Sequence, residues 1–240
     1  MSTKILALAV PFALLSFSST RALADYEEIA PSNPYPAPSA APERLRFSAG
    51  VRVSAQSDER YNEIVDSNVL AQFSLGASYT LITKNSWQLA AGLAWDLGGR
   101  SGTIRGQTSE VFSNRFTVPI DLRWKPSRRF LAFARVAPGA TLTNVSIREP
   151  SISDDISDLR AAFATDVSVG VSAALVSSTS TRKLWTWLTP ELGYGFAFAS
   201  NLRLARDRDA SAQLGSDQAT NLGTLGMSGV FGRLSVNFTY

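Results

Sequence analysis

The sequence predicts an all-β protein: a closed antiparallel up-and-down transmembrane β-barrel of eight strands, with short periplasmic turns and long extracellular loops. Three observations predict this fold. Apolar residues alternate with polar ones along eight extended segments, the charged residues of those segments all fall on the polar side, and the connections alternate between short and long. A period of two is typical of strands, because successive side chains of a strand point to opposite faces.

The segment Trp87–Leu97 shows the alternation most clearly. Its odd-numbered residues are all Trp, Leu or Ala, whereas its even-numbered residues run from Gln88 to Asp96 through Ala and Gly. The same separation recurs along the chain, so that eight strands are predicted. They are Leu45–Ala55, Val69–Leu81, Gln88–Asp96, Phe112–Trp124, Phe130–Leu142, Phe163–Leu175, Leu192–Phe198 and Val230–Tyr240.

The charged residues indicate which side of each strand faces inward. The apolar side of the eight segments contains no Asp, Glu, Lys or Arg. The opposite side carries ten charged residues: Arg46, Arg52, Asp96, Arg115, Asp121, Arg123, Arg135, Asp166, Glu191 and Arg233. An Arg or Lys at the bilayer midplane costs ~2–4 kcal/mol, and a typical domain is stable by only ~5–15 kcal/mol. The apolar side is therefore predicted to face lipid and the charged side to face the lumen.

The lumen charges predict a filled barrel. The interior of an eight-stranded barrel is just wide enough for side chains, and the six Arg can pair bidentately with the three Asp and one Glu. Two alternatives remain open at this point. The excess of two positive charges would suit a narrow channel for small anionic solutes. A soluble periplasmic lipocalin-like binder would instead need the apolar side to lie within the barrel.

The amino-terminal region predicts export. Lys4, the apolar run from Ile5 to Phe17 and the sequence Ala22-Leu23-Ala24 have the features of a cleavable signal peptide over residues 1–24. Residues 25–44 are rich in Pro and Ala and are predicted to form an extended periplasmic tail, followed by the barrel over residues 45–240. Without the signal the chain has 21 basic and 20 acidic residues, so its charge gives no reason to expect nucleic-acid binding.

The connections orient the barrel, because outer-membrane barrels have short turns on the periplasmic rim and long loops outside. The short connections are Thr83–Ser86, Lys125–Arg128 and Ser177–Lys183. The long ones are Gln56–Asn68, Gly98–Glu110, Ser146–Ala161 and Ser200–Gly223. Trp185 and Trp187 share the side of Glu191, out of phase with Leu192 to Phe198. We expect a β-bulge at Pro190, which lacks an N–H; the alternative is that both Trp point into the periplasmic mouth.

The last predicted strand carries a family resemblance. Leu234, Val236, Phe238 and Tyr240 alternate up to an aromatic carboxyl terminus, and this pattern resembles the closing strand of bacterial outer-membrane β-barrels. The resemblance implies that the barrel-assembly machinery reads these four residues, although Phe is more usual than Tyr at the last position. Over 45–240 the chain resembles the small eight-stranded barrels of the OmpA membrane domain and OmpX class, which implies a location in the bacterial outer membrane.

The composition argues against an enzyme. The sequence contains no His and no Cys, and a Ser hydroxyl is a weak nucleophile without an adjacent base. We expect no catalytic residues, no cofactor and no metal; the acidic cluster at Ser153–Asp158 is interpreted as a solvated loop. The expected role is structural or in surface interaction, as a monomer whose partners are outer-membrane lipid and lipopolysaccharide. Arginines of the long loops would contact lipopolysaccharide phosphates: Arg100, Arg105, Arg203, Arg206 and Arg208.

Overall fold

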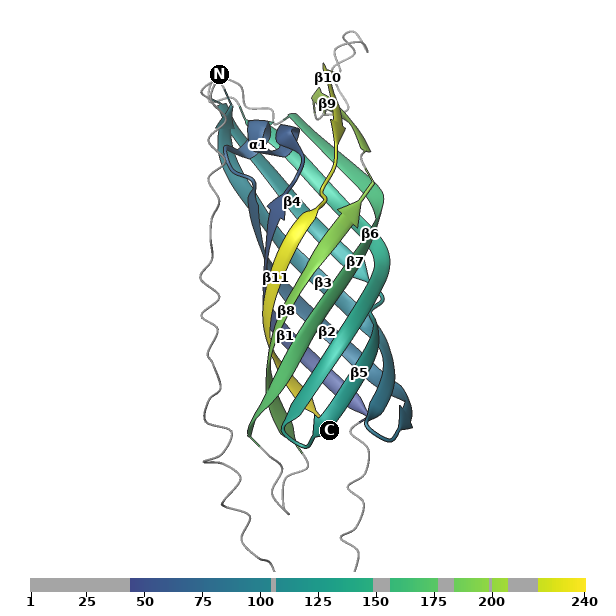
Figure 1. Cartoon of the computed structure of the whole chain (residues 1–240). Helices are drawn as coiled ribbons and strands as arrows, with labels where there is room; N and C mark the ends of the chain where they lie inside the picture. The colour runs from purple at the N-terminus through teal and green to yellow at the C-terminus, as the bar shows by residue number, and fades with distance from the viewer. Residues whose placement is uncertain (1–43, 105–106, 149–155, 177–183, 199, 207–219) are drawn as a thin grey trace, which may run out of the picture. The chain divides into compact units, whose positions relative to one another are not determined.

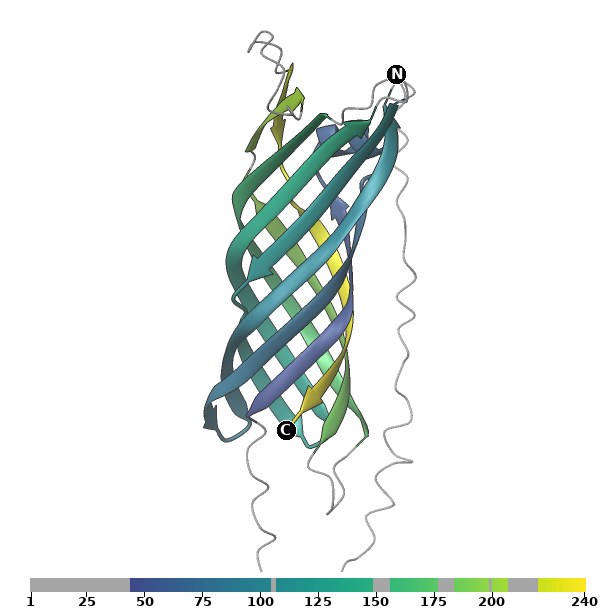
Figure 2. The ribbon, with the colours of Figure 1, turned by 180° about the vertical axis from the view of Figure 1, so that it is seen from behind.

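The computed structural model describes residues 44–104, 107–148, 156–176, 184–198, 200–206 and 220–240. Apart from one short helix, their regular elements are antiparallel strands (Figures 1 and 2). The strands are β1 (Leu45–Gln56), β2 (Val69–Lys84), β3 (Trp87–Ile104), β4 (Gln107–Thr117), β5 (Ile120–Ser127), β6 (Phe130–Arg148), β7 (Ile156–Val176), β8 (Trp185–Ala197), β9 (Ser200–Arg206), β10 (Thr220–Leu225) and β11 (Gly229–Thr239), and the helix is α1 (Glu59–Val65).

The sheet closes on itself through the pairing of β1 with β11, from Arg46–Thr239 to Gln56–Gly229. The strands β4 and β5 occupy a single place in the ring, because both lie between β3 and β6. The strands β9 and β10 form a hairpin beyond the ring. The ring therefore has eight positions, as the sequence predicts, and closure leaves no free edge within it.

The two faces of the wall have the predicted polarity. Leu93 and Val169 are 69% and 61% exposed on the outer wall, whereas Asp121 is 1% exposed in the lumen. The alternative of a soluble lipocalin-like barrel is wrong, because it requires the apolar side chains to be enclosed. Trp87 and Trp124 lie side by side on the outer wall next to the short turns, with ring centroids 6.4 Å apart. This is the amphipathic position that Trp favours at a lipid–water interface.

The prediction of a β-bulge at Pro190 was wrong. The register between β8 and β11 runs without a shift through the pair Pro190–Leu234. The irregularity in this part of the wall lies between Ala174 and Val176 of β7. Because β8 keeps its phase, Trp185 and Trp187 lie on the lumen side with Glu191, which is the alternative that the sequence left open. Pro190 is tolerated with its side chain turned outward.

The predicted long loops contain more regular structure than the sequence indicated. The strands β3 and β4 extend into the predicted loop Gly98–Glu110 as a continuous ladder that ends at the pair Ile104–Gln107. β6 and β7 are likewise paired out to Ile147–Ile156. Outside the bilayer neither face of a strand must be apolar, so these extensions lack the period-two signal that identifies a strand in a sequence.

The helix α1, which the sequence analysis missed, lies in the connection between β1 and β2. The Asp58 side chain caps its first turn by accepting a hydrogen bond from the Arg60 N–H at 3.0 Å. Asp66 ends the helix in the left-handed conformation, with φ of 52°. No helix among the described residues has the length and apolar composition of a membrane span. Figure 1 shows α1 at the end of the barrel opposite the C-terminus.

The orientation of the wall generates a stability prediction. Replacing Leu93 by Arg places a charge on the lipid-facing surface and should lower the free energy of unfolding by ~2–4 kcal/mol. The measurement is urea unfolding in lipid vesicles, followed by Trp fluorescence. The control is Leu93→Met, which keeps the surface apolar and should change stability little. Equal stability of the Arg and Met variants would contradict a lipid-facing Leu93.

Candidate functional site in the barrel lumen

Nine charged side chains form one continuous chain of ion pairs across the lumen. Arg and acidic residues alternate along it in the order Arg115, Asp166, Arg52, Asp96, Arg233, Glu191, Arg135, Asp121 and Arg123. All these residues lie on inward-facing positions of the strands β1, β3, β4, β5, β6, β7, β8 and β11. Because β4 and β5 share one place in the ring, seven of the eight ring positions contribute.

The chain begins on the side of β4 and β7. Arg115 Nη2 lies 2.5 Å from Asp166 Oδ1, and Arg52 Nη1 lies 2.9 Å from Asp166 Oδ2. Arg52 also reaches Asp96 Oδ2 at 2.8 Å. The Ser74 hydroxyl donates a further hydrogen bond to Asp96 Oδ1 at 2.5 Å. Arg52 thereby joins acidic residues from two strands that are not its neighbours in the sheet.

The middle of the chain crosses from β3 to β8 through Arg233 of β11. Arg233 Nη2 lies 2.8 Å from Asp96 Oδ2, and its Nη1 lies 3.2 Å from Glu191 Oε1. Arg135 Nη1 contacts Glu191 Oε2 at 2.9 Å. Glu191 also accepts a hydrogen bond from the Ser168 hydroxyl at 2.7 Å.

The chain ends at Asp121, which is held by two arginines. Arg135 Nε and Arg123 Nη2 approach its two carboxylate oxygens at 2.6 and 2.8 Å. The Arg123 Nη2 also donates to the Ser78 hydroxyl at 2.8 Å. Each of the four lumen carboxylates thus contacts two guanidinium groups, and all nine residues except Arg135, whose side chain is 16% exposed, are buried. Charges removed from water to this degree need such partners.

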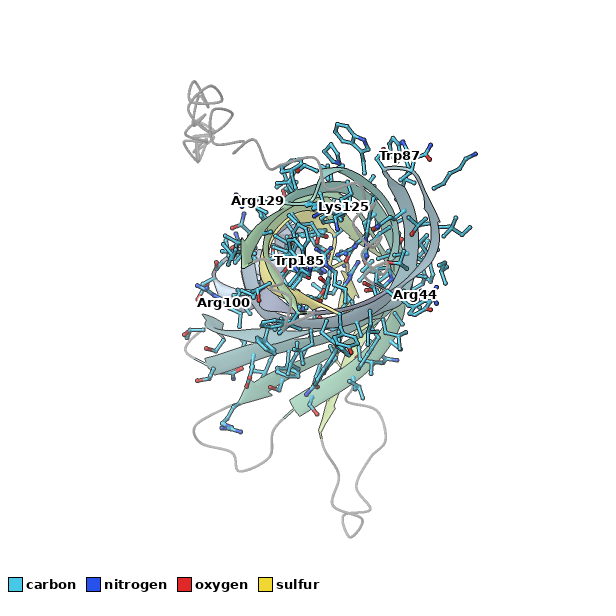
Figure 3. The ribbon with its side chains drawn as sticks, turned by 90° about the horizontal axis from the view of Figure 1, so that it is seen from below. Arg44, Trp87, Arg100, Lys125, Arg129 and Trp185 are labelled. Atoms are coloured by element: carbon cyan, nitrogen blue, oxygen red, sulfur yellow. The ribbon has the colours of Figure 1, made fainter. Side chains whose placement is uncertain are left out.

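Arg46, the tenth predicted lumen residue, lies nearer the periplasmic end. Its Nη2 donates to the Ser172 hydroxyl at 3.2 Å, and its guanidinium carbon lies 5.8 Å from the ring centroid of Trp187. Trp187 is fully buried and packs with Leu131 and Phe133. Figure 3 shows Trp185 at the centre of this mouth. The periplasmic end of the lumen is therefore closed by an aromatic and aliphatic layer.

The extracellular end of the lumen is closed by α1. Its Tyr61, Ile64 and Val65 belong to one buried apolar cluster with side chains of the wall and of the segment that precedes β11. The other members of the cluster are Leu70, Val111, Val145, Ala164, Ala197, Leu225 and Met227. Burial raises the pKa of Tyr61 to about 12, partly offset by the positive charge of Arg100. We call α1 and the other members of this cluster the extracellular cap.

Polar contacts attach the extracellular cap to strands on either side. The Arg60 guanidinium donates to the Thr224 carbonyl at 2.8 Å, and Asp58 Oδ2 accepts from the Gly226 N–H at 2.6 Å. On the other side, Asp66 Oδ2 accepts from the Thr103 N–H at 3.1 Å.

Gly102 allows this close packing, because a Cβ at that position would overlap the backbone of Val65. The sequence signals for the cap were the capping Asp58 and the helical spacing of Tyr61, Ile64 and Val65.

Some predicted site residues fall elsewhere. Arg105 and Arg208 lie outside the described residues, and for Arg203 and Arg206 only the backbone of β9 is described. Arg100 is exposed on the extension of β3. Residues 153–155 of the acidic cluster are also outside the described part, while Asp158 pairs with Arg160 at 2.8 Å. The four residues of the closing-strand pattern, Leu234, Val236, Phe238 and Tyr240, face outward, and their reading by an assembly machinery stays a prediction.

The ion-pair chain generates a second stability prediction. Asp121→Ala leaves Arg123 and Arg135 without a shared carboxylate and should lower the free energy of unfolding by ~3–5 kcal/mol, the usual cost of breaking a buried pair. The matched control is Asp158→Ala, which breaks the more exposed pair with Arg160 and should cost ~0–1 kcal/mol. Urea unfolding in detergent measures both. Similar losses in the two variants would contradict a buried network.

Comparisons with known proteins find solved structures of low sequence identity. No protein-family model and no curated protein matches the sequence. Similar solved structures include a major outer membrane protein of Thermus thermophilus (TM-score 0.49, 11% identity, covering 82% of this chain and 99% of that one). They also include the attachment invasion locus protein Ail of Yersinia pestis (TM-score 0.42, 11% identity, 82% and 98%) and the outer membrane protease OmpT of Escherichia coli (TM-score 0.45, 8% identity, 84% and 98%).

The assignment of the fold depends on the barrel itself. A closed ring pairs the backbone groups that lipid cannot satisfy, the outer wall is apolar, and the charges lie within. The protein is an eight-stranded antiparallel β-barrel whose outer wall and lumen have the polarity of a membrane-spanning barrel.

Proposed function

We propose that this protein is a non-conducting structural barrel that displays a contact surface outside the cell. The observation that carries this proposal is the filling of the lumen at three levels. The Trp187 layer closes the periplasmic end, the ion-pair chain crosses the middle, and the extracellular cap closes the other end. A cavity of about 30 Å³ lies between these layers, near Arg46, Ser74 and Asn237, and has room for water rather than for a solute.

The proposed role does not include catalysis. A general base needs a carboxylate or imidazole with an accessible lone pair and a pKa near the working pH. Each lumen carboxylate instead contacts two arginines, which occupy its oxygens. This supports the expectation, drawn from the lack of His, that the lumen has no acid–base role.

The extracellular hairpins supply the proposed contact surface. The pairs β3–β4 and β6–β7 continue beyond the ring, and the hairpin β9–β10 joins β7 through the pairs Ile156–Arg206 and Ser157–Ala205. Figure 1 shows this hairpin extending from the same end of the barrel as α1. Rigid strands position side chains more precisely than free loops do, which suits recognition of an external surface. We propose that the barrel acts as a monomer in this role.

A bilayer measurement tests the filled lumen. Protein reconstituted in a planar lipid bilayer should give no conductance steps, because each of three layers blocks the path. Gly102→Ala forces α1 away from β3, and this variant should also stay silent because the other two layers remain. Anion-selective steps from the unmodified protein would instead support the competing function, a narrow channel that exploits six lumen Arg against four acids.

We further propose that the extracellular arginines hold lipopolysaccharide phosphates. The variant Arg100→Ser/Arg203→Ser/Arg206→Ser should retain less lipopolysaccharide during detergent extraction, because guanidinium groups bind phosphate oxygens in a bidentate manner. The measurement is lipopolysaccharide per mole of purified protein. Lys84→Ser/Arg128→Ser/Arg129→Ser removes the same number of cations from the opposite rim and should leave retention unchanged. Equal retention by the two triple variants would remove this proposal.

A further inference from the structure

The lipid-facing wall contains an apolar groove of about 600 Å³ that crosses β11, β1, β2, β3 and β4. Its two ends carry aromatic pairs from neighbouring strands, Phe47 with Phe238 and Trp95 with Phe116. The outward side chains between them include the small Ala49 and Ala77. The groove therefore lies between two raised aromatic positions on an otherwise convex surface.

The groove slopes from the periplasmic rim towards the middle of the membrane. At its lower end Phe47 is two residues from the start of β1, and Phe238 is next to the last residue of β11. At its upper end Val118 is separated from the short turn after β5 by the whole of that strand, Ile120–Ser127. Crossing four strand spacings gives it a length of roughly 19 Å. The length of the groove is thus comparable to the roughly 15 Å thickness of one leaflet of the hydrocarbon core.

The periplasmic rim next to this lower end is basic. Arg44 directly precedes β1, is exposed, and has its N–H bonded to the Tyr240 carbonyl at 3.2 Å. The described short turns add Lys84, Lys125, Arg128 and Arg129, and no Asp or Glu side chain occurs in the part of this rim that the structure describes. Figure 3 shows Arg44, Lys125 and Arg129 spaced around the rim. Such a rim attracts anionic headgroups.

We propose that the groove binds one acyl chain of an anionic phospholipid from the periplasmic leaflet, with the lipid phosphate next to Arg44. A flexible acyl chain can follow an inclined groove and fill it, and it gains dispersion contacts along its whole length. The convex wall of a second copy would instead meet the two aromatic pairs and leave the space between them empty. The slope also fits this lipid, because its headgroup lies at the basic rim and its chain rises towards the midplane.

Filling the groove tests the site. Native mass spectrometry of protein extracted from vesicles of phosphatidylglycerol and phosphatidylethanolamine should show one retained phospholipid per barrel. Ala77→Phe occupies the groove and should reduce the lipid-bound fraction by roughly tenfold, about 1.4 kcal/mol in affinity. The matched control is Ala134→Phe, an outward position on β6 away from the groove, which should retain lipid as the unmodified protein does. The heat-dependent gel shift of a folded barrel verifies that both variants fold. If Ala77→Phe does not fold, Ala49→Phe takes its place.

The headgroup is tested separately. Arg44→Gln should keep one lipid bound but abolish the preference for phosphatidylglycerol over phosphatidylethanolamine, whereas Arg128→Gln, in the turn between β5 and β6, should keep that preference. The proposal is overturned if the unmodified protein retains no lipid or if the two Phe variants retain it equally. It is also overturned if the protein forms a dimer that Ala77→Phe dissociates, which would identify a second copy as the occupant.

Discussion

The pairing of every backbone polar group within a closed sheet is the constraint on which the rest of this structure depends. Lipid offers no hydrogen bonds, so a chain that crosses it as strands must join its first strand to its last, here β1 to β11. Closure then fixes the alternation of side chains between lipid and lumen. Because lipid excludes charge, the ten charged residues predicted to lie in the lumen can lie only inside, where each must be matched by a partner of opposite sign or a hydrogen bond.

The buried chain of ion pairs follows from this constraint and from the small circumference of the ring. Eight strands leave space for side chains alone, and the chain of ion pairs uses that space with alternating signs from Arg115 to Arg123. Apolar clusters flank the network at either end, around Trp187 and around α1. The interior and the outer wall thus have separate roles: the interior supports the shape, and the wall and hairpins remain for contact with lipid and with the surroundings.

Sequence reasoning predicted the orientation of the strands but not the contacts within the lumen. The side on which Asp121 and Arg135 lie follows from parity, and the structure buries both. Partner choice follows pairing along the sheet only in part. Asp121 and Arg135 are directly opposite in the β5–β6 ladder and form an ion pair. Arg115 is directly opposite Asp96 in the β3–β4 ladder, yet it pairs with Asp166 of β7. The bulge predicted at Pro190 was wrong, because the missing N–H of a proline does not by itself shift the register between two strands. The helix α1 was missed because a seven-residue segment in a polar connection gives little periodic signal.

The positions of Arg52 and Arg233 have a consequence for how the barrel is built. These residues lie on the first and last strands of the ring, and their acidic partners lie 42 to 137 residues away along the chain, on β3, β7 and β8. An unclosed sheet would separate Arg52 from Asp166 and Arg233 from Asp96, because each of these pairs spans the seam between β1 and β11. Some lumen charges are therefore neutralised only when β1 and β11 meet. A partly assembled barrel carries the free-energy cost of those unpaired charges, and this cost makes closure and insertion cooperative.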